Sequence, residues 1–508
     1  MAGAAPFPGL NDGEGADKKT APSLLNLSAD FSTYPAAKAG TMNGVIMQRV
    51  IGYAIATIAF SSLSGTPSVA HGGKGDWDVD QRELRGAPVD VTTLLTAARG
   101  APPVICALAS RAVRGYGWGD WSDAPATPLG SVVSMSRSDF DMQQQLPAAD
   151  VQRLLAGLAS DDACVREMSV RLIGTQKAEA VGSELVTRLG ATDPNLRSVA
   201  AFGLGLVDAE NGVDPLVRTL RDPVIDVRAN AAWALGRIEN GRALQPLVSL
   251  FSDDAEKVRE AAVVAVGHME STSTIPALIR VLRQDSSPRV RRVAAWALGA
   301  LEARDAIDAL GGVLARDADP AVREMAAWAL GSIEDRRGLP PLAAAIRSDA
   351  EDRVRETAVW AVGQLEDRSS IDVLGAATGD RSPRVRGTAA WAIGQLDENG
   401  AKAPPGLLRL LSDESADTRL KAAWALGQIE DAGALPAIRD ALRNEKNDRV
   451  RRGLIRALMK SGGRSEADLT DLLNSSDPHV REAAVRGLAG RNAFDPWPWP
   501  WPRPRPFP

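Results

Sequence analysis

The side chains that most often carry catalysis or bind metals are scarce in this sequence. It has two cysteines, Cys106 and Cys164, and three histidines, His71, His268 and His479. Glu270 follows His268 by two residues, a spacing that does not bring two side chains to one face of a helix. Metal-binding His-Glu-x-x-His and Cys-x-x-Cys motifs, phosphate-binding loops and Gly-x-Ser-x-Gly are all missing from the sequence. We therefore predict a chain that is not an enzyme and has no metal site and no cofactor.

Tryptophans recur at one position of a repeated motif, and they are the first candidates for a binding site. The position lies five residues after an arginine that itself recurs, and on a helical wheel Trp233 falls about 240° from Val227, away from Leu235 and Ile238. Two interpretations follow, because each ring can anchor a partner on the inner side of a helical array or can pack on the next repeat. The predicted partner-binding residues are Trp233, Trp296, Trp328, Trp360, Trp391 and Trp424.

The same position holds arginine at both ends of the series, at Arg171, Arg456 and Arg486. Arginine is seldom fully buried, so we expect this position to reach the surface. The groove predicted from this row runs from Trp296 to Trp424 and would hold an extended or helical peptide.

A second row is acidic and stands eleven residues after each recurring arginine. Glutamate near the C-terminal end of a helix is unfavourable for the helix dipole, so the row is either a solvated edge or an acidic rim that steers a basic partner. The predicted rim consists of Glu239, Glu302, Glu334, Glu366 and Glu430, with Glu270 and Asp397 at the same position in other units.

The last residues alternate proline with tryptophan, arginine or phenylalanine, which forces an extended backbone. Such a segment is either an unstructured extension or a ligand for an aromatic groove or a membrane surface. The predicted tail-binding residues are Trp497, Trp499, Trp501, Arg503 and Arg505.

The recurring arginine defines the elements that must position these rows. Its successive intervals are 31, 31, 31, 32, 32, 32, 31, 33, 32 and 30 residues, and a fixed period of this size indicates a stacked repeat protein. The series is Arg166, Arg197, Arg228, Arg259, Arg291, Arg323, Arg355, Arg386, Arg419, Arg451 and Arg481. In residues 241–267, apolar side chains fall on one face of each of two helices, separated by a break at Ser252-Asp253-Asp254. Each unit is therefore a pair of helices that buries its apolar faces by stacking.

The repeated motif Val-Arg-x-x-Ala-Ala-x-Ala-Leu-Gly, with an aspartate six residues before the arginine, resembles the HEAT repeat in the bacterial HEAT-like form that also occurs in phycobilisome lyases. The resemblance covers residues 148–490 and implies that aspartate and arginine link successive repeats in a ladder. These acidic residues are Asp222, Asp253, Asp285, Asp317, Asp349, Asp380 and Asp413, with Glu445 in the next unit. The first two units and the last lack this aspartate, and Ser475 stands there in the last.

The segment before the repeats has the composition of an export signal. A short basic start at residues 42–49 precedes an apolar run from Val50 to Phe60, and small residues stand at Ser68 and Ala70. We predict a signal peptide at 42–70 that is removed before His71, with residues 1–41 a disordered or mis-annotated extension. The run is shorter than the roughly 20 residues of a membrane-spanning helix; a buried helix is the alternative.

The two cysteines stand near the starts of predicted second helices, Cys106 in the N-terminal cap and Cys164 in the first full repeat. An oxidising compartment permits a disulfide between them. The alternative is two buried free thiols, because cysteine is commonly buried.

The predicted fold is all-α: a right-handed α-solenoid of about eleven two-helix HEAT-like repeats with a degenerate N-terminal cap repeat. The domains are 71–147, a helical cap and loop, 148–490, the repeats, and 491–508, the extended tail. The formal charge of −5 argues against nucleic acid as a partner. We predict an exported scaffold, periplasmic or associated with the bacterial envelope, that binds a protein or peptide. The alternatives are an enzyme of the bilin-lyase kind, which the resemblance suggests, and an assembly or membrane-surface factor acting through the tail.

Overall fold

The computed structural model describes residues 90–102, 106, 145–396 and 402–462, and single positions between 470 and 485. The chain divides into two compact units, 1–86 and 87–508, and every described residue belongs to the second. The predicted extension at 1–41, the signal peptide at 42–70 and the tail at 491–508 lie outside the described residues.

The second unit is an α-solenoid, as the repeat period predicts. Over the described ranges, all of its secondary-structure elements are helices, joined by turns and short loops. The first helices of the repeats are α4 (Ala148–Gly157), α6 (Ala178–Arg188), α8 (Val213–Thr219), α10 (Leu244–Ser249), α12 (Ile275–Gln284), α14 (Ile307–Arg316), α16 (Leu339–Ser348), α18 (Ile371–Ala377), α20 (Pro405–Arg409) and α22 (Leu435–Asn444). The second helices are α5 (Ala163–Ile173), α7 (Pro194–Leu206), α9 (Ile225–Ile238), α11 (Glu256–His268), α13 (Pro288–Ala300), α15 (Pro320–Ser332), α17 (Asp352–Gln364), α19 (Pro383–Gln395), α21 (Ala416–Ile429) and α23 (Asp448–Lys460).

Short 3-10 helices complete the connections between these helices. All of those in the described ranges except η6 and η11 directly precede the first helix of a repeat, and η6 and η11 directly follow one. They are η4 (Glu210–Gly212), η5 (Gly241–Ala243), η6 (Leu250–Ser252), η7 (Thr272–Thr274), η8 (Arg304–Ala306), η9 (Arg336–Gly338), η10 (Arg368–Ser370), η11 (Leu410–Ser412) and η12 (Ala432–Ala434).

Local sequence signals explain where the helices begin, and α15 is representative. Asp319 precedes the helix, and its carboxylate accepts hydrogen bonds from the backbone N–H groups of Ala321 and Val322. Pro320 occupies the first turn, where the missing N–H has no helical acceptor. The helix then places Val322 and Leu330 in the core, so the same few residues start the helix and orient its apolar face.

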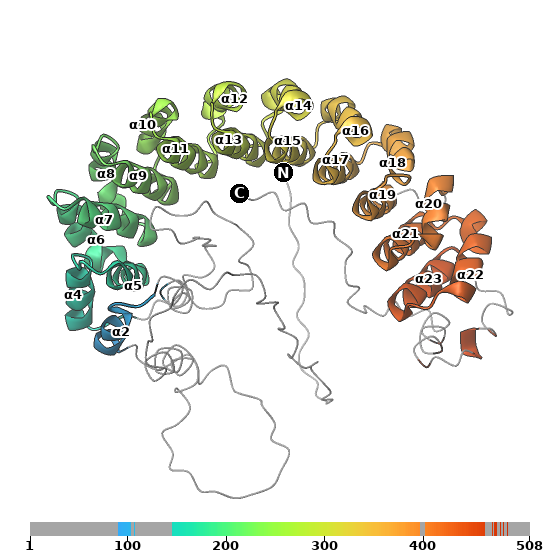
Figure 1. Cartoon of the computed structure of the whole chain (residues 1–508), viewed down its shortest axis with the longest axis horizontal. Coiled ribbons are helices and arrows are strands. Elements are labelled where there is room, and N and C mark those ends of the chain that lie inside the picture. Colours follow the sequence, from blue (N-terminus) through green and yellow to red (C-terminus); the bar gives the residue numbers. More distant parts are fainter. Residues whose placement is uncertain are drawn as a thin grey trace, which may run out of the picture. The chain divides into compact units, whose positions relative to one another are not determined.

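The helices of this unit form two layers (Figure 1). The second helices from α9 to α23 line the inner side of the curve, and the first helices from α8 to α22 lie outside them. One apolar cluster runs between the layers without a break, from Val91 to Leu472. Each repeat buries its apolar face against its neighbours, as expected of a solenoid.

A cap precedes the first full repeat. The helix expected at this place is present as α2 (Val91–Ala98), and Asp90 caps its first turn by accepting the backbone N–H of Thr92 and of Thr93. Cys106 and Cys164 are joined by a disulfide with 5.6 Å between their Cα atoms, which resolves the two alternatives that the sequence leaves open. The disulfide fastens the cap to α5. Over the described ranges, no helix is long and apolar enough to span a bilayer.

Candidate functional site

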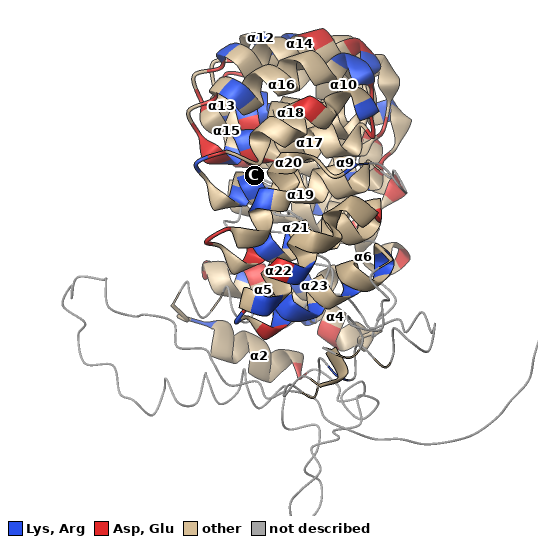
Figure 2. Cartoon of the chain, turned by 90° about the vertical axis from the view of Figure 1, so that its right-hand side faces the viewer, with Lys and Arg blue, Asp and Glu red and all other residues tan. Residues whose placement is uncertain are grey.

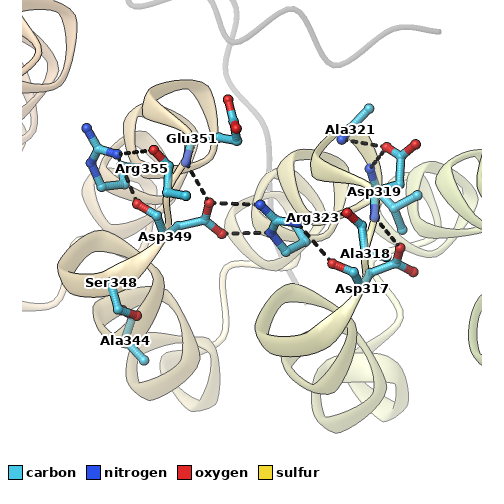
Figure 3. A network of polar contacts seen from close by, with 12 residues as sticks. Asp317, Ala318, Asp319, Ala321, Arg323, Ala344, Ser348, Asp349, Glu351 and Arg355 are labelled. Atoms are coloured by element: carbon cyan, nitrogen blue, oxygen red, sulfur yellow. Dashed lines mark hydrogen bonds and ion pairs between the residues drawn. The ribbon is translucent and has the colours of Figure 1, made fainter.

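The recurring arginines form the ladder that the resemblance implies. Arg323 donates from Nε and Nη2 to the two carboxylate oxygens of Asp349 in the next repeat, at 2.8 and 3.0 Å. Its Nη1 donates to the carbonyl oxygen of Asp317 in its own repeat at 2.9 Å (Figure 3). The rungs with this geometry are Arg197–Asp222, Arg228–Asp253, Arg259–Asp285, Arg291–Asp317, Arg323–Asp349, Arg355–Asp380, Arg386–Asp413 and Arg419–Glu445.

The rungs are shielded from water, and the Arg323–Asp349 rung shows how its acid is held in the ionised form. The side chains of Arg323 and Asp349 are 15% and 7% exposed. Burial raises the pKa of Asp349, but the hydrogen bonds from Arg323 and from the backbone N–H of Glu351 outweigh burial and bring the pKa below its ordinary value. At the N-terminal end, Arg166 donates to the carbonyl of Ser160, and Ala191 stands where the next aspartate would be.

The tryptophans pack between successive second helices. A Cβ atom added to Gly299 would lie 2.8 Å from Cζ3 of Trp328 and 2.9 Å from the Cα of Ala329. The same contact places Trp233, Trp296, Trp360, Trp391 and Trp424 against the glycines at 205, 267, 331, 363 and 394. The glycine that ends each repeated motif is therefore needed for the close approach of the next repeat, and the ring packing predicted as one alternative is present.

The burial of the rings differs along the row. Trp296, Trp391 and Trp424 are 8%, 2% and 8% exposed, whereas Trp233, Trp328 and Trp360 are half-buried. The expectation that arginine marks this position as a surface position is wrong at Arg171, which is 3% exposed. There Arg171 donates to Glu167 one turn earlier at 2.8 Å and its guanidinium lies over the ring of Phe202, so charge pairing and ring contact make the burial possible.

The acidic row has an unexpected backbone conformation. Glu239, Glu302, Glu334 and Glu366 have φ angles of 52°, 47°, 52° and 46°, in the left-handed region, and Asp208, Glu270 and Glu430 share it. Glycine or asparagine usually occupies this place after a helix. All of these side chains are exposed, and they lie at the C-terminal ends of the second helices, opposite the ladder. Asp397 lies outside the described residues.

Comparison with known proteins identifies the repeat. The model of the family described as HEAT repeats matches residues 182–267, 275–363, 339–408 and 403–489, which together make up more than half of the chain. The chain belongs to the HEAT-repeat family. A model of the PBS lyase HEAT-like repeat also matches, at residues 258–284. None of the curated proteins compared with the chain matches it.

Solved HEAT-repeat structures share its fold. Yeast importin-β (Kap95p) is 14% identical with a TM-score of 0.54, and the match covers 87% of this chain and 67% of that one. A structure of importin-β in ammonium sulfate is 15% identical with a TM-score of 0.54, covering 75% of this chain and 58% of that one. Kap95p with RanGDP matches at 14% identity and a TM-score of 0.52, covering 87% and 66%. At this identity the likeness shows the fold alone.

The few residues of the HEAT array that are typical of catalytic sites do not converge. His268 is exposed, and its ring centroid lies 5.1 Å from that of Trp296. Among the described residues, no group of three or more His, Cys, Asp or Glu side chains is placed to hold a metal ion. The predicted tail residues Trp497, Trp499, Trp501, Arg503 and Arg505 lie outside the described ranges.

Sequence reasoning missed a set of charged residues on the inner layer of the HEAT array. They stand two residues before and one residue after the ladder arginines. Arg289 forms an ion pair with Glu260 of the preceding repeat, 3.6 Å between Nη2 and Oε1, and Arg384 donates to Glu356 of its preceding repeat. Aligning the repeats on the ladder arginine would have revealed the acid after the arginine and the base before the next one.

Proposed function

We propose that this HEAT-repeat chain is an exported, non-catalytic scaffold that binds a protein or peptide partner on the inner layer of its array. The observation that carries the proposal is the pair of half-buried rings at Trp328 and Trp360, on the consecutive inner helices α15 and α17, with a third half-buried ring at Trp233 on α9. Aromatic side chains with an exposed part, set on a rigid frame, are typical anchors of protein interfaces. Kap95p, which shares this fold, engages protein partners in its structures with RanGDP and with Nup1.

The disulfide supports the export part of the proposal. Structural disulfides form and persist in oxidising compartments and are rare in the cytosol. Cys106 and Cys164 are also the only cysteines of the sequence. Together with the predicted signal peptide at 42–70, the pair favours the periplasm or envelope of a bacterium. N-terminal sequencing of the native protein is expected to start at His71; a native chain beginning at Met1 or Ala2 would contradict the export proposal.

Two pairs of tryptophan variants test the binding role. Affinity purification from an envelope fraction, followed by mass spectrometry, supplies a partner whose affinity is then measured with purified protein. Replacing the half-buried Trp328 and Trp360 with Gln removes both the exposed ring surface and the packing on the preceding repeat. Replacing the buried Trp391 and Trp424 with Gln removes only packing.

We expect both double variants to lose stability and only the Trp328/Trp360 variant to lose affinity, by about tenfold or more per folded molecule. Equal affinities of the two folded variants would show that the rings only hold the stack together, and would contradict an inner binding surface at these rings.

Two alternatives make different predictions. The match to the PBS lyase HEAT-like repeat covers residues 258–284 and favours a bilin-lyase-like enzyme; a bilin pigment absorbing in the visible range and carried through purification would support it. If instead the tail is the binding element, for a partner or a membrane surface, deletion of residues 496–508 will abolish association while the melting temperature stays unchanged. The scaffold proposal expects association to persist in this deletion.

A further inference from the structure

The charged residues of the inner layer follow a pattern that holds in some repeats and is reversed within its central stretch. The position after the ladder arginine is acidic at Glu167, Glu260, Glu324, Glu356 and Glu482 and uncharged in four units, but it is basic at Arg292, between two acidic repeats, and at Arg452. The position two residues before the next ladder arginine holds the basic partner in the intact pairs. After Arg292 this position is Ala321, so the repeat supplies no side chain for an ion pair there.

Arg292 lies on the side of α13 that faces away from the outer layer. It follows the fully buried Val290 by two residues, which places it about 200° around the helix from that core residue. Trp296 stands one turn later on α13, and the half-buried Trp328 occupies the same position on α15. The Trp328 ring packs at Gly299, about two helical turns along α13 from Arg292, so an extended segment bound at Arg292 can reach it.

Arg292 forms no ion pair in the described part of the chain. Its side chain is half-buried, and its Nε is sealed from solvent without a hydrogen-bond partner. Burial lowers the pKa of Arg292 and the nearby Arg289 lowers it further, whereas Glu260, Asp319 and Glu324 act in the opposite direction. Burying part of a guanidinium without a hydrogen-bonded anion is unfavourable, and a carboxylate on the rest of the guanidinium would supply that anion.

The surrounding charges limit the kind of anion. Between α11 and α19 these two positions carry the basic residues Lys257, Arg289, Arg292, Arg353 and Arg384 and the acidic residues Glu260, Glu324 and Glu356. These two positions together are thus net positive in a chain of formal charge −5. The interspersed glutamates would repel a polyanion such as a nucleic acid, whereas one carboxylate can lie between them. Acidic and basic residues are interspersed along the array in Figure 2 as well.

We propose that the inner layer at α13 and α15 binds an acidic polypeptide segment, with an Asp or Glu carboxylate on the Arg292 guanidinium and an adjacent apolar side chain on the exposed part of the Trp328 ring. The inference rests on the proposed scaffold function and specifies the chemistry of its partner. Arginine matches a carboxylate with two parallel hydrogen bonds, which gives geometric as well as charge selectivity. The basic C-terminal tail, with Arg503 and Arg505, has the wrong charge for this site.

Selection from a random library of displayed 12-residue peptides on the immobilised full-length protein tests the proposal. Three proteins are compared: the wild type, Arg292→Glu and Arg280→Glu. The first substitution restores the acid that other repeats carry at this position, so the fold is expected to persist, and a thermal melt checks this. The second makes the same charge change at an exposed position of α12, on the outer layer of the same repeat.

We expect the wild type to enrich peptides in which Asp or Glu adjoins an apolar residue. A synthetic copy of such a peptide should bind Arg292→Glu about tenfold more weakly or worse, and Arg280→Glu within about twofold of the wild type. Enrichment of basic or uncharged peptides, or acidic peptides that bind Arg292→Glu as well as the wild type, would overturn the inference but leave the scaffold function standing. No enrichment at all would count against both.

Discussion

The N-terminal end of each second helix and its inner face differ in how strictly the repeats agree. At the N-terminal end, every rung from Arg197–Asp222 to Arg419–Glu445 joins an arginine to the acid of the next repeat with nearly the same geometry. On the inner face, the charged position after the arginine changes from Glu260 to Arg292 to Glu324 within three repeats. Residues that hold neighbouring repeats together must recur, because every junction needs them. Residues that recognise a partner are free to differ from one repeat to the next.

Removing one acid from a rung is expected to give the largest effect. Asp349→Ala leaves Arg323 shielded from water and unpaired, and we expect a loss of about 3 kcal/mol in the free energy of unfolding, measured by urea denaturation. The control is Asp214→Ala, whose ion pair with Arg242 is 64% and 59% exposed on its two side chains and should cost less than about 1 kcal/mol. Similar losses in both variants would show that the rungs are no more than ordinary surface pairs.

Acid should weaken the same rungs together. Burial raises the pKa of the ladder acids, but the hydrogen bonds from arginine outweigh it. The resulting pKa values lie below the ordinary 3.8 at Asp222, Asp253, Asp317, Asp349 and Asp380. The folded chain therefore binds fewer protons at these groups than the unfolded chain, and their contribution is complete above about pH 5 and lost progressively below pH 4. Burial raises the pKa of Glu260 and Glu324, which opposes this trend.

Urea denaturation at pH 7, 5 and 3.5 checks the sign. We expect the free energy of unfolding to drop between pH 5 and 3.5, and to drop less in Asp349→Ala, which lacks one of the titrating carboxylates. Unchanged or increased stability at pH 3.5 would be incompatible with an ionised ladder.

The glycine contacts give a smaller effect with opposite signs at two positions. A Cβ at Gly331 would lie 2.8 Å from the Cα of Ala361 in the next repeat, so Gly331→Ala should force the two helices apart and cost about 1–3 kcal/mol. Gly375 in α18 has no neighbouring atom within 4 Å of an added Cβ. There the alanine should stabilise by roughly 0.5–1 kcal/mol because it is the better helix former. Melting temperatures that move in the same direction for both variants would mean that the repeats are not in close contact at Gly331.

An effect about as small as that at Gly375 is expected at the acidic row. Glu334 has a φ of 52°, a conformation that glycine adopts without steric strain, so Glu334→Gly should stabilise the chain by roughly 1 kcal/mol. As a control, Glu184→Gly inside α6 should destabilise by about 1 kcal/mol. Destabilisation by Glu334→Gly would show that the carboxylate makes a favourable contact. Stabilisation would leave partner steering as a reason for the acid to be there.

The repeats themselves could be predicted from the sequence, because their period, their capping aspartates and their small residues at contact positions are all local signals. That aspartate and arginine link successive repeats followed from the family resemblance; that each arginine pairs with the acid of the following repeat is seen only in the structure. The left-handed backbone at Glu302 or Glu366 could not be predicted, because helical periodicity ends at this point and the residue type is a poor guide to a positive φ.

Burial of charge was the least predictable property. Arg171 was expected at the surface from its residue type, yet it is buried, since Glu167 pairs with it from the preceding turn. The spacing of four residues between the two was a signal that could have been used. The half-burial of Arg292, and the absence of a hydrogen-bond partner for its Nε within the described residues, depend on how α13 packs among its neighbours, which periodicity does not give.

The division between residues that hold the array and residues that select a partner can be tested in one crossed measurement. Urea denaturation and titration with an acidic peptide selected on the wild type are carried out on Asp349→Ala and on Arg292→Glu. We predict that Asp349→Ala loses about 3 kcal/mol of stability and binds normally while folded, and that Arg292→Glu keeps its stability and binds at least about tenfold more weakly. If Arg292→Glu lost stability as Asp349→Ala does, or if the two variants bound the peptide equally well, the inner-face arginine would be part of the frame and the division would be contradicted.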